Sequence, residues 1–466
     1  MNIVLFNRDL RVCDHQPLTE AGKIGEFLPL YVFEPSVWNE TDLSARHLQF
    51  VLESLEELSV QMQARGGKLF FAIGEMKDVF EELLKFYGKI TVFAYEKGVL
   101  NRPFMQSLVE QGQEVFLYSP ILQPVLVNKF KSQWFEYSSE PLFNPPVRIS
   151  GPTEIPEIVF TDLKRLQSSN VKGSKIRFGQ QGGELKALET LDSFLEGRYL
   201  NYVKNHQKPI SSSLSSSRLS AYIAWGNISV RTAFQRTNEK LQACGHEHEK
   251  YQLEVFLSKL LLHDKISFLP RKEERETNLS YIKDEWNECM FQRWLSGKTG
   301  IPIIDAAMRS LHKTGWLNMT MREMAVSFIC NTLWMDCKKP SKALAGLFLD
   351  YEPAVHDYYM GKIAGKSVHR IKIVNPIKRG KQLDADGSFI RRYVPELNAI
   401  PEEFVHEPWL YPGFYSLGYE TPMIDVMKAN KQAKMRFEKM DPTPTTERIA
   451  RQKKIDGGSE QLFFEF

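Results

Sequence analysis

Residues 297–316 read GKTGIPIIDAAMRSLHKTGW and hold the clearest structural signal in the chain. Pro302 suits the first turn of a helix, where its missing N–H costs nothing. Apolar residues then recur at helical spacing: Ile304, Met308 and Leu311. Gly315 can end the helix in a left-handed conformation, which glycine adopts readily. The stretch therefore predicts an amphipathic helix with a sharp end, on which Asp305 and Arg309 can pair because they are four residues apart.

The size and composition are those of an ordinary globular protein. The chain has 466 residues, enough for two or three domains with large cores. Hydrophobic residues make up 42% and charged residues 25%, and the net charge is only +3. Such a small net charge does not indicate a nucleic-acid-binding protein, so any basic footprint must be local. No stretch is long enough to span a membrane, and we expect no membrane contact.

The cysteines bear on compartment and metal binding. They are scattered without any CxxC pair: Cys13, Cys244, Cys289, Cys330 and Cys337. An odd, dispersed set, behind a start that lacks the apolar core of a signal peptide, predicts reduced thiols and a cytoplasmic protein. Cys244, His246 and His248 are metal-ligand types, but no partner cluster lies near them in the sequence. We therefore expect no metal site.

The first part of the chain alternates short apolar runs with amphipathic segments. The runs are residues 2–6, 28–33, 68–73, 90–95 and 115–119. Continuous apolar runs of this length are typical of strands buried on both faces of a sheet. Helical patterns lie between them, for example over 43–65 and 76–86, and the alternation predicts a doubly wound parallel α/β sheet. This part carries neither GxGxxG nor GxxxxGK[ST], so nothing local indicates a dinucleotide or triphosphate site.

The rest of the chain divides by composition. A connector rich in Pro, Ser and Gly follows the α/β region, and helical periodicity dominates from about Glu184 onward. We predict an α/β antenna-like domain over 1–125, a connector over 126–185, an all-α domain over 186–441 and a tail over 442–466. The tail closes on an apolar peptide, GGSEQLFFEF, which either docks on the body of the protein or binds a protein partner.

Four segments resemble, in order and spacing, the signatures of the photolyase/cryptochrome flavoproteins. They are residues 216–231 (SSRLSAYIAWGNISVR), 297–316, 347–353 (LFLDYEP) and 375–397 (NPIKRGKQLDADGSFIRRYVPEL). The early FNRDLRVCDH, residues 6–15, is similar to the opening motif of the family's antenna domain. The resemblance implies blue-light chemistry with FAD bound in the all-α domain. The family's antenna domain often holds a second chromophore, a pterin or a flavin, which these residues do not assign.

The resemblance also implies the residues of the FAD site. On one side the matching groups are the ring of Tyr202, the hydroxyls of Ser216, Ser217 and Ser220, and the backbone of Leu219. Hydroxyls at a helix start can bind a diphosphate, although a serine-rich loop that only caps a helix is the alternative. On the other side the matching residues are Trp316, Arg322, Asp350, Glu352 and His356.

Two of these matches carry specific chemistry. In the family, Arg322 and Asp350 match a pair beside the flavin ring, where a cation offsets the negative charge of the reduced ring. Glu352 matches an acidic contact at the ring edge. His356 matches the position that faces flavin N5, where a histidine could titrate near neutrality and tune proton delivery. The alternatives are an ordinary interhelix salt bridge for the pair and a satisfied core histidine for His356.

The chain departs from the family at the positions that repair pyrimidine dimers. Leu262 replaces the tryptophan that stacks on the dimer, and Lys259 replaces the carboxylate that binds its polar edge. Further positions are replaced by Phe256, His263, Asn318–Thr320 and Met360–Lys362. Base–aromatic stacking is worth about 1–3 kcal/mol per base, so we expect a photosensory or otherwise non-repairing homologue. Two alternatives stay open: a light-driven DNA photolyase with an atypical pocket, and a DNA- or protein-binding scaffold with structural FAD.

The family's electron relay to the flavin is also replaced. The positions of its three tryptophans hold Met360, Cys337 and Asp284, none of which is aromatic. A rerouted relay could use aromatic residues nearby in the sequence: Trp334, Tyr358 and Tyr359.

A basic stretch follows the flavin-edge segment. Its cations, without one acid between them, are Lys362, Lys366, His369, Arg370, Lys372, Lys378, Arg379 and Lys381. Such a run can supply salt-dependent phosphate contacts and predicts binding to DNA or another polyanion. A solvated face is the alternative.

Overall fold

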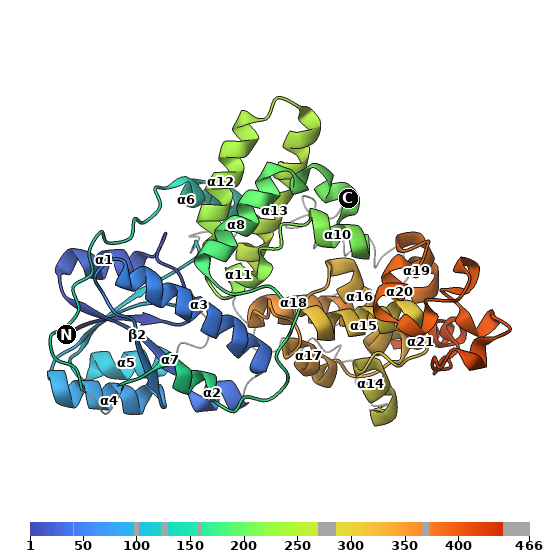
Figure 1. Ribbon diagram of the computed structural model, residues 1–466, viewed down its shortest axis with the longest axis horizontal. Coiled ribbons are helices and arrows are strands. Elements are labelled where there is room, and N and C mark those ends of the chain that lie inside the picture. Colours follow the sequence, from blue (N-terminus) through green and yellow to red (C-terminus); the bar gives the residue numbers. More distant parts are fainter. Residues whose placement is uncertain are drawn as a thin grey trace.

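The computed structural model describes residues 1–40, 42–96, 102–122, 129–156, 160–268, 286–365 and 372–440. The molecule has an α/β region at one end and helices over the rest (Figure 1). Predictions for Lys366, His369, Arg370, Asp284 and the tail at 442–466 lie outside the described residues. Among the described residues, no helix is long and apolar enough to cross a lipid bilayer.

The α/β region is built on one sheet with strand order β5-β4-β1-β2-β3-β6. The strands are β1 Asn2–Phe6, β2 Phe27–Phe33, β3 Phe70–Ile73, β4 Thr91–Tyr95, β5 Glu114–Tyr118 and β6 Phe160–Thr161. Strands β1 to β5 pair in parallel, which confirms the predicted α/β class. The short β6 pairs antiparallel with β3. It was not predicted, because two residues carry no period.

Helices cover both faces of the sheet, which is why strands β1 to β4 are continuous apolar runs. The prediction that the run at 115–119 is buried on both faces was wrong, because β5 lies at the edge of the sheet and Phe116 and Leu117 are exposed. The helices are α1 Gln16–Ile24, α2 Pro35–Glu40, α3 Ala45–Gln63, α4 Met76–Tyr87 and α5 Arg102–Glu110. Helices α4 and α5 share one apolar core with the sheet, whereas α1 and α3 pack into another (Figure 1). The predicted helices at 43–65 and 76–86 correspond to α3 and α4 within two residues.

The rest of the described chain is helical, as the sequence predicts. The connector holds α6 Phe130–Ser139 and α7 Leu163–Gln167. The first helical group is α8 Glu184–Glu196, α9 Tyr202–Asn205, α10 Pro209–Ser215, α11 Ser220–Ala224, α12 Val230–Ala243 and α13 Glu247–Phe268. The second is α14 Glu288–Leu295, α15 Pro302–Thr314, α16 Met319–Ser327, α17 Lys338–Ala345, α18 Pro353–Ala364, α19 Pro376–Leu383, α20 Ser388–Tyr393 and α21 Val426–Met440.

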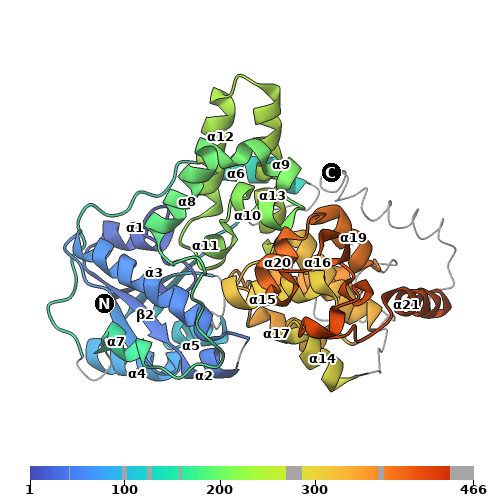
Figure 2. The same cartoon turned by 45° about the vertical axis from the view of Figure 1, so that its right-hand side comes forward.

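The two helical groups belong to different cores. Residues of α8 and α11 to α13 share the core that lies on the α3 face of the sheet, whereas α14 to α18 and α20 build a separate core (Figure 2). The apolar core therefore continues across residue 185, where we placed a domain boundary. That boundary, like the other domain limits, stays a prediction.

Helix α15 confirms the helix predicted within residues 297–316, but not the predicted ion pair between Asp305 and Arg309. Gly315 ends the helix with φ at 70°, in the left-handed region. Asp305 is fully buried and accepts hydrogen bonds from the N–H groups of Thr299 and Gly300, at 2.7 and 3.0 Å. Arg309 instead forms its ion pair with Glu396, at 2.8 Å. The predicted Asp305–Arg309 pair was wrong because both side chains find partners outside the helix.

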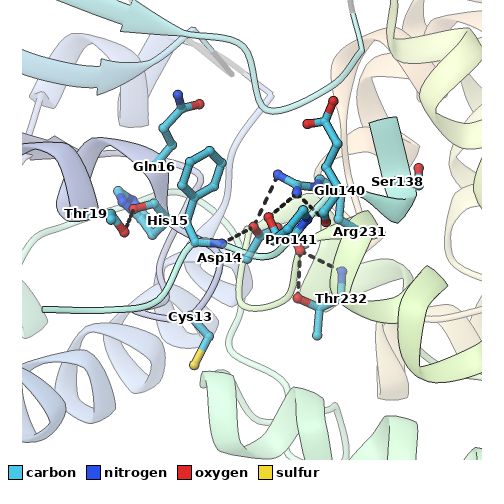
Figure 3. Close-up of polar contacts among 12 residues, drawn as sticks. Cys13, Asp14, His15, Gln16, Thr19, Ser138, Glu140, Pro141, Arg231 and Thr232 are labelled. Atoms are coloured by element: carbon cyan, nitrogen blue, oxygen red, sulfur yellow. Dashed lines mark hydrogen bonds and ion pairs between the residues drawn. The ribbon is translucent and has the colours of Figure 1, made fainter. Parts of the chain in front are cut away.

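The opening motif at residues 6–15 joins the α/β region to the helical region (Figure 3). The carboxylate of Asp14 lies 3.4 Å from the guanidinium of Arg231 on α12 and accepts the N–H of Phe143 at 3.1 Å. Arg231 also donates to the carbonyl oxygens of Glu140 and Pro141, at 2.8 and 2.7 Å. Both charged side chains are almost fully buried. The contact therefore fixes the connector and α12 onto the loop between β1 and α1.

Two arginines of the opening motif also donate hydrogen bonds across this junction. Arg8 donates to the carbonyl of Tyr351 at 2.7 Å, and Arg11 donates to the carbonyl of Gly226 at 3.0 Å. Gly226 has φ at 72°, and a Cβ on it would lie 2.2 Å from the carbonyl oxygen of Arg8. Only glycine therefore permits this approach of the two regions.

Candidate functional site

The serine-bearing segment between α10 and α11 has an unusual backbone. Ser216 follows α10 in extended conformation, and Arg218 has φ at 61°, which non-glycine residues adopt rarely. Gln180 donates to the carbonyl of Arg218 at 2.8 Å, and Arg198 donates to the carbonyl oxygens of Ser216 and Ser217. These partners hold the strained segment in place. The side chains of Ser216, Ser217 and Arg218 are half-buried, Leu219 is buried and Ser220 is exposed.

Arg218 links this segment to the end of α15. Its guanidinium lies over the ring of Trp316, with the carbon 4.0 Å from the ring centre. Burial lowers the pKa of Arg218 to about 10, while the charge of Asp350 opposes that change and the charge of Arg322 adds to it. Arg218, Trp316, Arg322 and Asp350 therefore share one neighbourhood, although they come from three separate stretches of chain.

The predicted pair of Arg322 and Asp350 is present. Arg322 on α16 donates to the carboxylate of Asp350 at 2.6 Å, and its guanidinium lies over the ring of Phe348 at 4.0 Å. The side chains of Arg322 and Asp350 are 20% and 8% exposed. A second donation, from Arg322 to the carbonyl of Leu317 at 3.0 Å, fixes the guanidinium further.

Two buried oxygens of this neighbourhood have no partner within the chain. Within the part of the chain that the structure describes, the hydroxyl of Ser216 and one carboxylate oxygen of Asp350 are buried and accept or donate no hydrogen bond. Buried polar atoms are normally satisfied, so such orphans call for a further partner. FAD carries phosphate, ribityl and ring groups that can hydrogen-bond with a hydroxyl and a carboxylate, together with an anionic charge for Arg218 and Arg322. The residues present thus fit FAD.

Glu352 lies apart from that pair. It accepts hydrogen bonds from His263 and Ser267 on α13, at 3.1 and 3.0 Å, and His263 also contacts Asp264 at 3.1 Å. Asp350 lies in a turn and Glu352 is the residue before α18, so the two carboxylates reach different partners, Arg322 on α16 and His263 on α13. The structure thus separates two acids that the sequence placed in one half of the site.

The pairing of His263 predicts a pH-dependent stability. Burial lowers the pKa of His263, but Glu352 and Asp264 outweigh burial and raise the pKa to about 9. The charged imidazole therefore stabilises the fold fully below its unfolded pKa of about 6.5. This contribution, on the order of 2–3 kcal/mol, is lost as the pH rises through about 9.

The free energy of unfolding should accordingly fall between pH 6.5 and 9.5 in the wild type, and fall less in His263→Gln. Denaturant titrations at several pH values measure both slopes. Equal slopes for the two proteins would contradict a charged His263.

His356 is not poised to titrate near neutrality. Its Nε2 lies 3.0 Å from both the hydroxyl and the carbonyl oxygen of Ser341 on α17. Burial lowers the pKa of His356 to about 4, although the bond to Ser341 opposes that change. The ring is therefore neutral at physiological pH, and the predicted proton tuning by its titration is not supported. The charges of Arg322 and Asp350 act on it, which places His356 near their pair.

Tyr202 lies on α9, against aromatic rings of the first helical group. Its ring packs edge-on to Phe194 and Phe256, at 5.6 and 6.1 Å between centroids. Burial, and to a smaller degree Tyr359, raises its pKa. The role of Tyr202 in binding FAD phosphates stays a prediction.

The sequence did not single out Arg198 or Arg218 as site residues. Arg218 stands inside the quoted motif, and its place directly after two serines was a usable signal. Arg198 had none, because a contact with carbonyl oxygens eighteen residues away depends on the fold.

Some cations of the basic stretch form ion pairs that its sequence does not indicate. Lys372 pairs with Glu323 at 2.6 Å, and Lys381 pairs with Glu407. These acids come from other parts of the chain, so the stretch is not an unbroken run of unpaired cations. Lys372, Lys378 and Arg379 nevertheless line one side of a groove of about 330 Å³ between α16 and α19.

Comparisons with known proteins identify similar domains in this chain. Residues 2–99 match the family model for DNA photolyase, and residues 254–439 match the model for the FAD-binding domain of DNA photolyase. A deoxyribodipyrimidine photo-lyase of Vibrio cholerae is 27% identical, with 94% of this chain and 99% of that protein covered. Cryptochrome-2 of Arabidopsis thaliana is 26% identical, with 92% and 77% covered.

Solved structures share the fold. A cryptochrome from Synechocystis has a TM-score of 0.80 at 22% identity, covering 93% of this chain and 98% of that one. An archaeal photolyase from Sulfolobus tokodaii, described with two FAD molecules, has a TM-score of 0.73 at 24% identity, covering 94% and 100%. Repair enzymes and photoreceptors are thus both among the similar proteins, and the similarity alone does not decide between them.

Proposed function

Because the chain belongs to the photolyase/cryptochrome family, we propose that it is a blue-light-absorbing FAD protein that does not repair pyrimidine dimers in the usual way. The match of residues 254–439 to the FAD-binding domain supports the cofactor. The two orphaned oxygens of Ser216 and Asp350 support its location. Bound FAD would supply absorption of blue light and one-electron chemistry.

We assign the cofactor to the residues that the sequence singled out, with one addition. The segment Ser216–Ser220 and Tyr202 bind the diphosphate side, and Arg218 adds a cation there. Arg322, fixed by Asp350 and by Leu317, keeps a positive charge where the reduced ring gains negative charge. Trp316 and the neutral ring of His356 close the site against water. Glu352 forms an ion pair with His263 and so contributes to the site through α13.

The proposal against ordinary repair depends on the surface of α13. Lys259 occupies the position of the dimer-binding carboxylate, and Leu262, which is buried, occupies that of the stacking tryptophan. Burial, and then the charge of Lys362, lowers the pKa of Lys259, so a lysine of α18 also lies close. Lys259 and Lys362 thus place two cations where the repair pattern has a carboxylate that accepts hydrogen bonds from the polar edge of the dimer.

Illumination of the purified protein with an oligonucleotide that holds one dimer tests this proposal. Without the stacking partner, worth about 1–3 kcal/mol, dimer loss should be at least about tenfold slower than with a photolyase under the same light. Lesion loss is followed by chromatography. Repair at the photolyase's rate would establish the alternative, a DNA photolyase with an atypical pocket. A protein without flavin absorption would favour a scaffold that has lost FAD.

The groove between α16 and α19 is our candidate for contact with DNA. Replacing Lys378 and Arg379 together by alanine should weaken binding of single-stranded DNA and reduce the slope of log K against log salt by about one per lost phosphate contact. Lys186→Ala, an exposed lysine on α8, is the control. Identical salt slopes for the double variant and the wild type would rule out this groove as the phosphate contact.

The remaining expectations stay proposals. A second chromophore in the α/β region is supported by the match of residues 2–99. It would not sit in the cavity bordered by Arg8 and Trp38 at the end of β1, which at about 30 Å³ holds about one water. We also propose that the tail at 442–466 docks a protein partner and that the protein is cytoplasmic.

A further inference from the structure

Tyr351 stands out as an oxidisable side chain beside the proposed flavin site. It lies between Asp350 and Glu352 in the chain, and only 8% of it is exposed. Its ring packs edge-on against His356, with 5.3 Å between the ring centres. His356 in turn lies under the influence of Arg322 and Asp350. Tyr351 is therefore one ring away from the pair that we assign to the flavin.

The phenol of Tyr351 has a proton acceptor in place. Its hydroxyl donates to the carboxylate of Asp42 at 3.2 Å. A phenol that loses an electron becomes strongly acidic, so a neighbouring carboxylate lets the proton leave over one hydrogen bond. Asp42 stands before α3 and Tyr351 before α18, so the fold itself brings the two groups together. Arg8, His47 and Asp357 are the other charged or titratable groups near the phenol.

Trp225, a buried tryptophan whose ring, like that of Tyr351, contacts Arg8 and His47, is a poorer donor. The guanidinium carbon of Arg8 lies 4.2 Å from the centre of its ring, and its Nε1 donates to the carbonyl of Leu349 at 2.9 Å. Oxidised Trp225 would be a cation facing a cation, and an amide oxygen is a weak base for its proton. Oxidised Tyr351 becomes neutral when its proton moves to Asp42, so the charge of Arg8 opposes it much less.

The residues suggested by sequence are placed less well. Trp334 packs in a small cluster with Ala433 and Phe437, separate from the core of α14 to α18. Tyr358 and Tyr359 contact each other edge-on at 5.2 Å on α18. Tyr351 instead packs on His356, beside the Arg322–Asp350 pair.

We propose that Tyr351 is a redox-active residue that gives one electron to the light-excited, oxidised flavin and its phenolic proton to the carboxylate of Asp42. The inference depends on the proposed function, since it needs bound FAD. The products on the protein are a neutral Tyr351 radical and a protonated Asp42. An external thiol then returns one hydrogen atom to the phenoxyl oxygen, and Asp42 releases its proton to water.

The test uses the full-length, FAD-loaded chain, with transient absorption and electron paramagnetic resonance after a blue flash. We expect a neutral tyrosyl radical whose resonance spectrum changes when the protein is made with ring-deuterated tyrosine. Tyr351→Phe should lose this signal while it keeps its flavin content and melting temperature. Asp42→Asn should slow formation of the radical and abolish the difference between its rates of formation in water and in heavy water. Tyr358→Phe and Tyr359→Phe are matched controls that should keep the signal.

The outcomes separate this inference from the proposed function. A yellow protein whose tyrosyl signal survives in Tyr351→Phe, or that shows only a tryptophan radical, would overturn the role of Tyr351 and leave the flavin assignment intact. A wild-type chain that binds no FAD would overturn the proposed function itself. The melting temperature and flavin content of each variant are read before any flash, so a folding defect is recognised independently.

Discussion

Replacing Arg322 by leucine should weaken FAD binding by at least about tenfold, or about 1.4 kcal/mol, and lower the stability of the fold as well. The change removes the cation that we place beside the flavin and leaves Asp350, only 8% exposed, without its partner. Breaking a buried pair from one side typically costs about 3–5 kcal/mol. Titration of flavin-depleted protein with FAD measures the affinity, and denaturant unfolding measures the stability.

A purely structural pair would also lose stability, so the decisive quantity is the gain on adding FAD. A ligand at a hundred times its Kd stabilises the native state by about 2.7 kcal/mol. We expect the wild type to show such a gain and Arg322→Leu to lose most of it. Arg309→Leu is the matched control, since it breaks the ion pair between Arg309 on α15 and Glu396. If Arg322→Leu gained as much stability from FAD as the wild type, the flavin role of Arg322 would be wrong.

Replacing Arg231 by leucine should have the largest effect on stability, about 3–5 kcal/mol. Arg231 is 4% exposed and satisfies the carboxylate of Asp14 together with the carbonyl oxygens of Glu140 and Pro141. Its loss leaves the buried carboxylate of Asp14 without its cation and removes two hydrogen bonds to the connector, where the α/β region meets the helices (Figure 3). Denaturant unfolding of the purified variant measures the change.

The same helix offers the control. Arg236 on α12 pairs with Asp192 at 2.5 Å, but both side chains are 42% exposed, and exposed pairs contribute about 0–1 kcal/mol. Arg236→Leu should therefore leave stability nearly unchanged. Similar losses for both variants would show that the contacts of Arg231 do not hold the junction.

The fold was largely predictable because its signals are local. The strands were predicted from five continuous apolar runs and the helix of residues 302–314 from the period of 3.6 residues, and the structure confirms these elements. Strand β6 was missed because two residues carry no period. The apolar core that continues past residue 185 was equally invisible, since packing between distant segments leaves no mark on local composition.

The site was predictable only in part, for the same reason. The Arg322–Asp350 pair followed from motifs, but the pairing of Glu352 with His263 depends on how α13 packs against the start of α18, which the motifs do not show. Arg309 and Lys372 form ion pairs with acids from elsewhere in the chain, which local sequence does not indicate. Asp42 and Tyr351 are separated by some three hundred residues, and no pattern in the sequence connects them.

The flavin content of the purified chain tests the central claim most directly. Protein made in flavin-replete cells, or flavin-depleted protein given FAD, should carry FAD in a stoichiometric amount, visible in its absorption and released on denaturation. Ser216→Ala and Asp350→Asn, which alter the two orphaned oxygens, should each hold FAD less tightly. A colourless wild-type chain that takes up no added FAD would contradict the account.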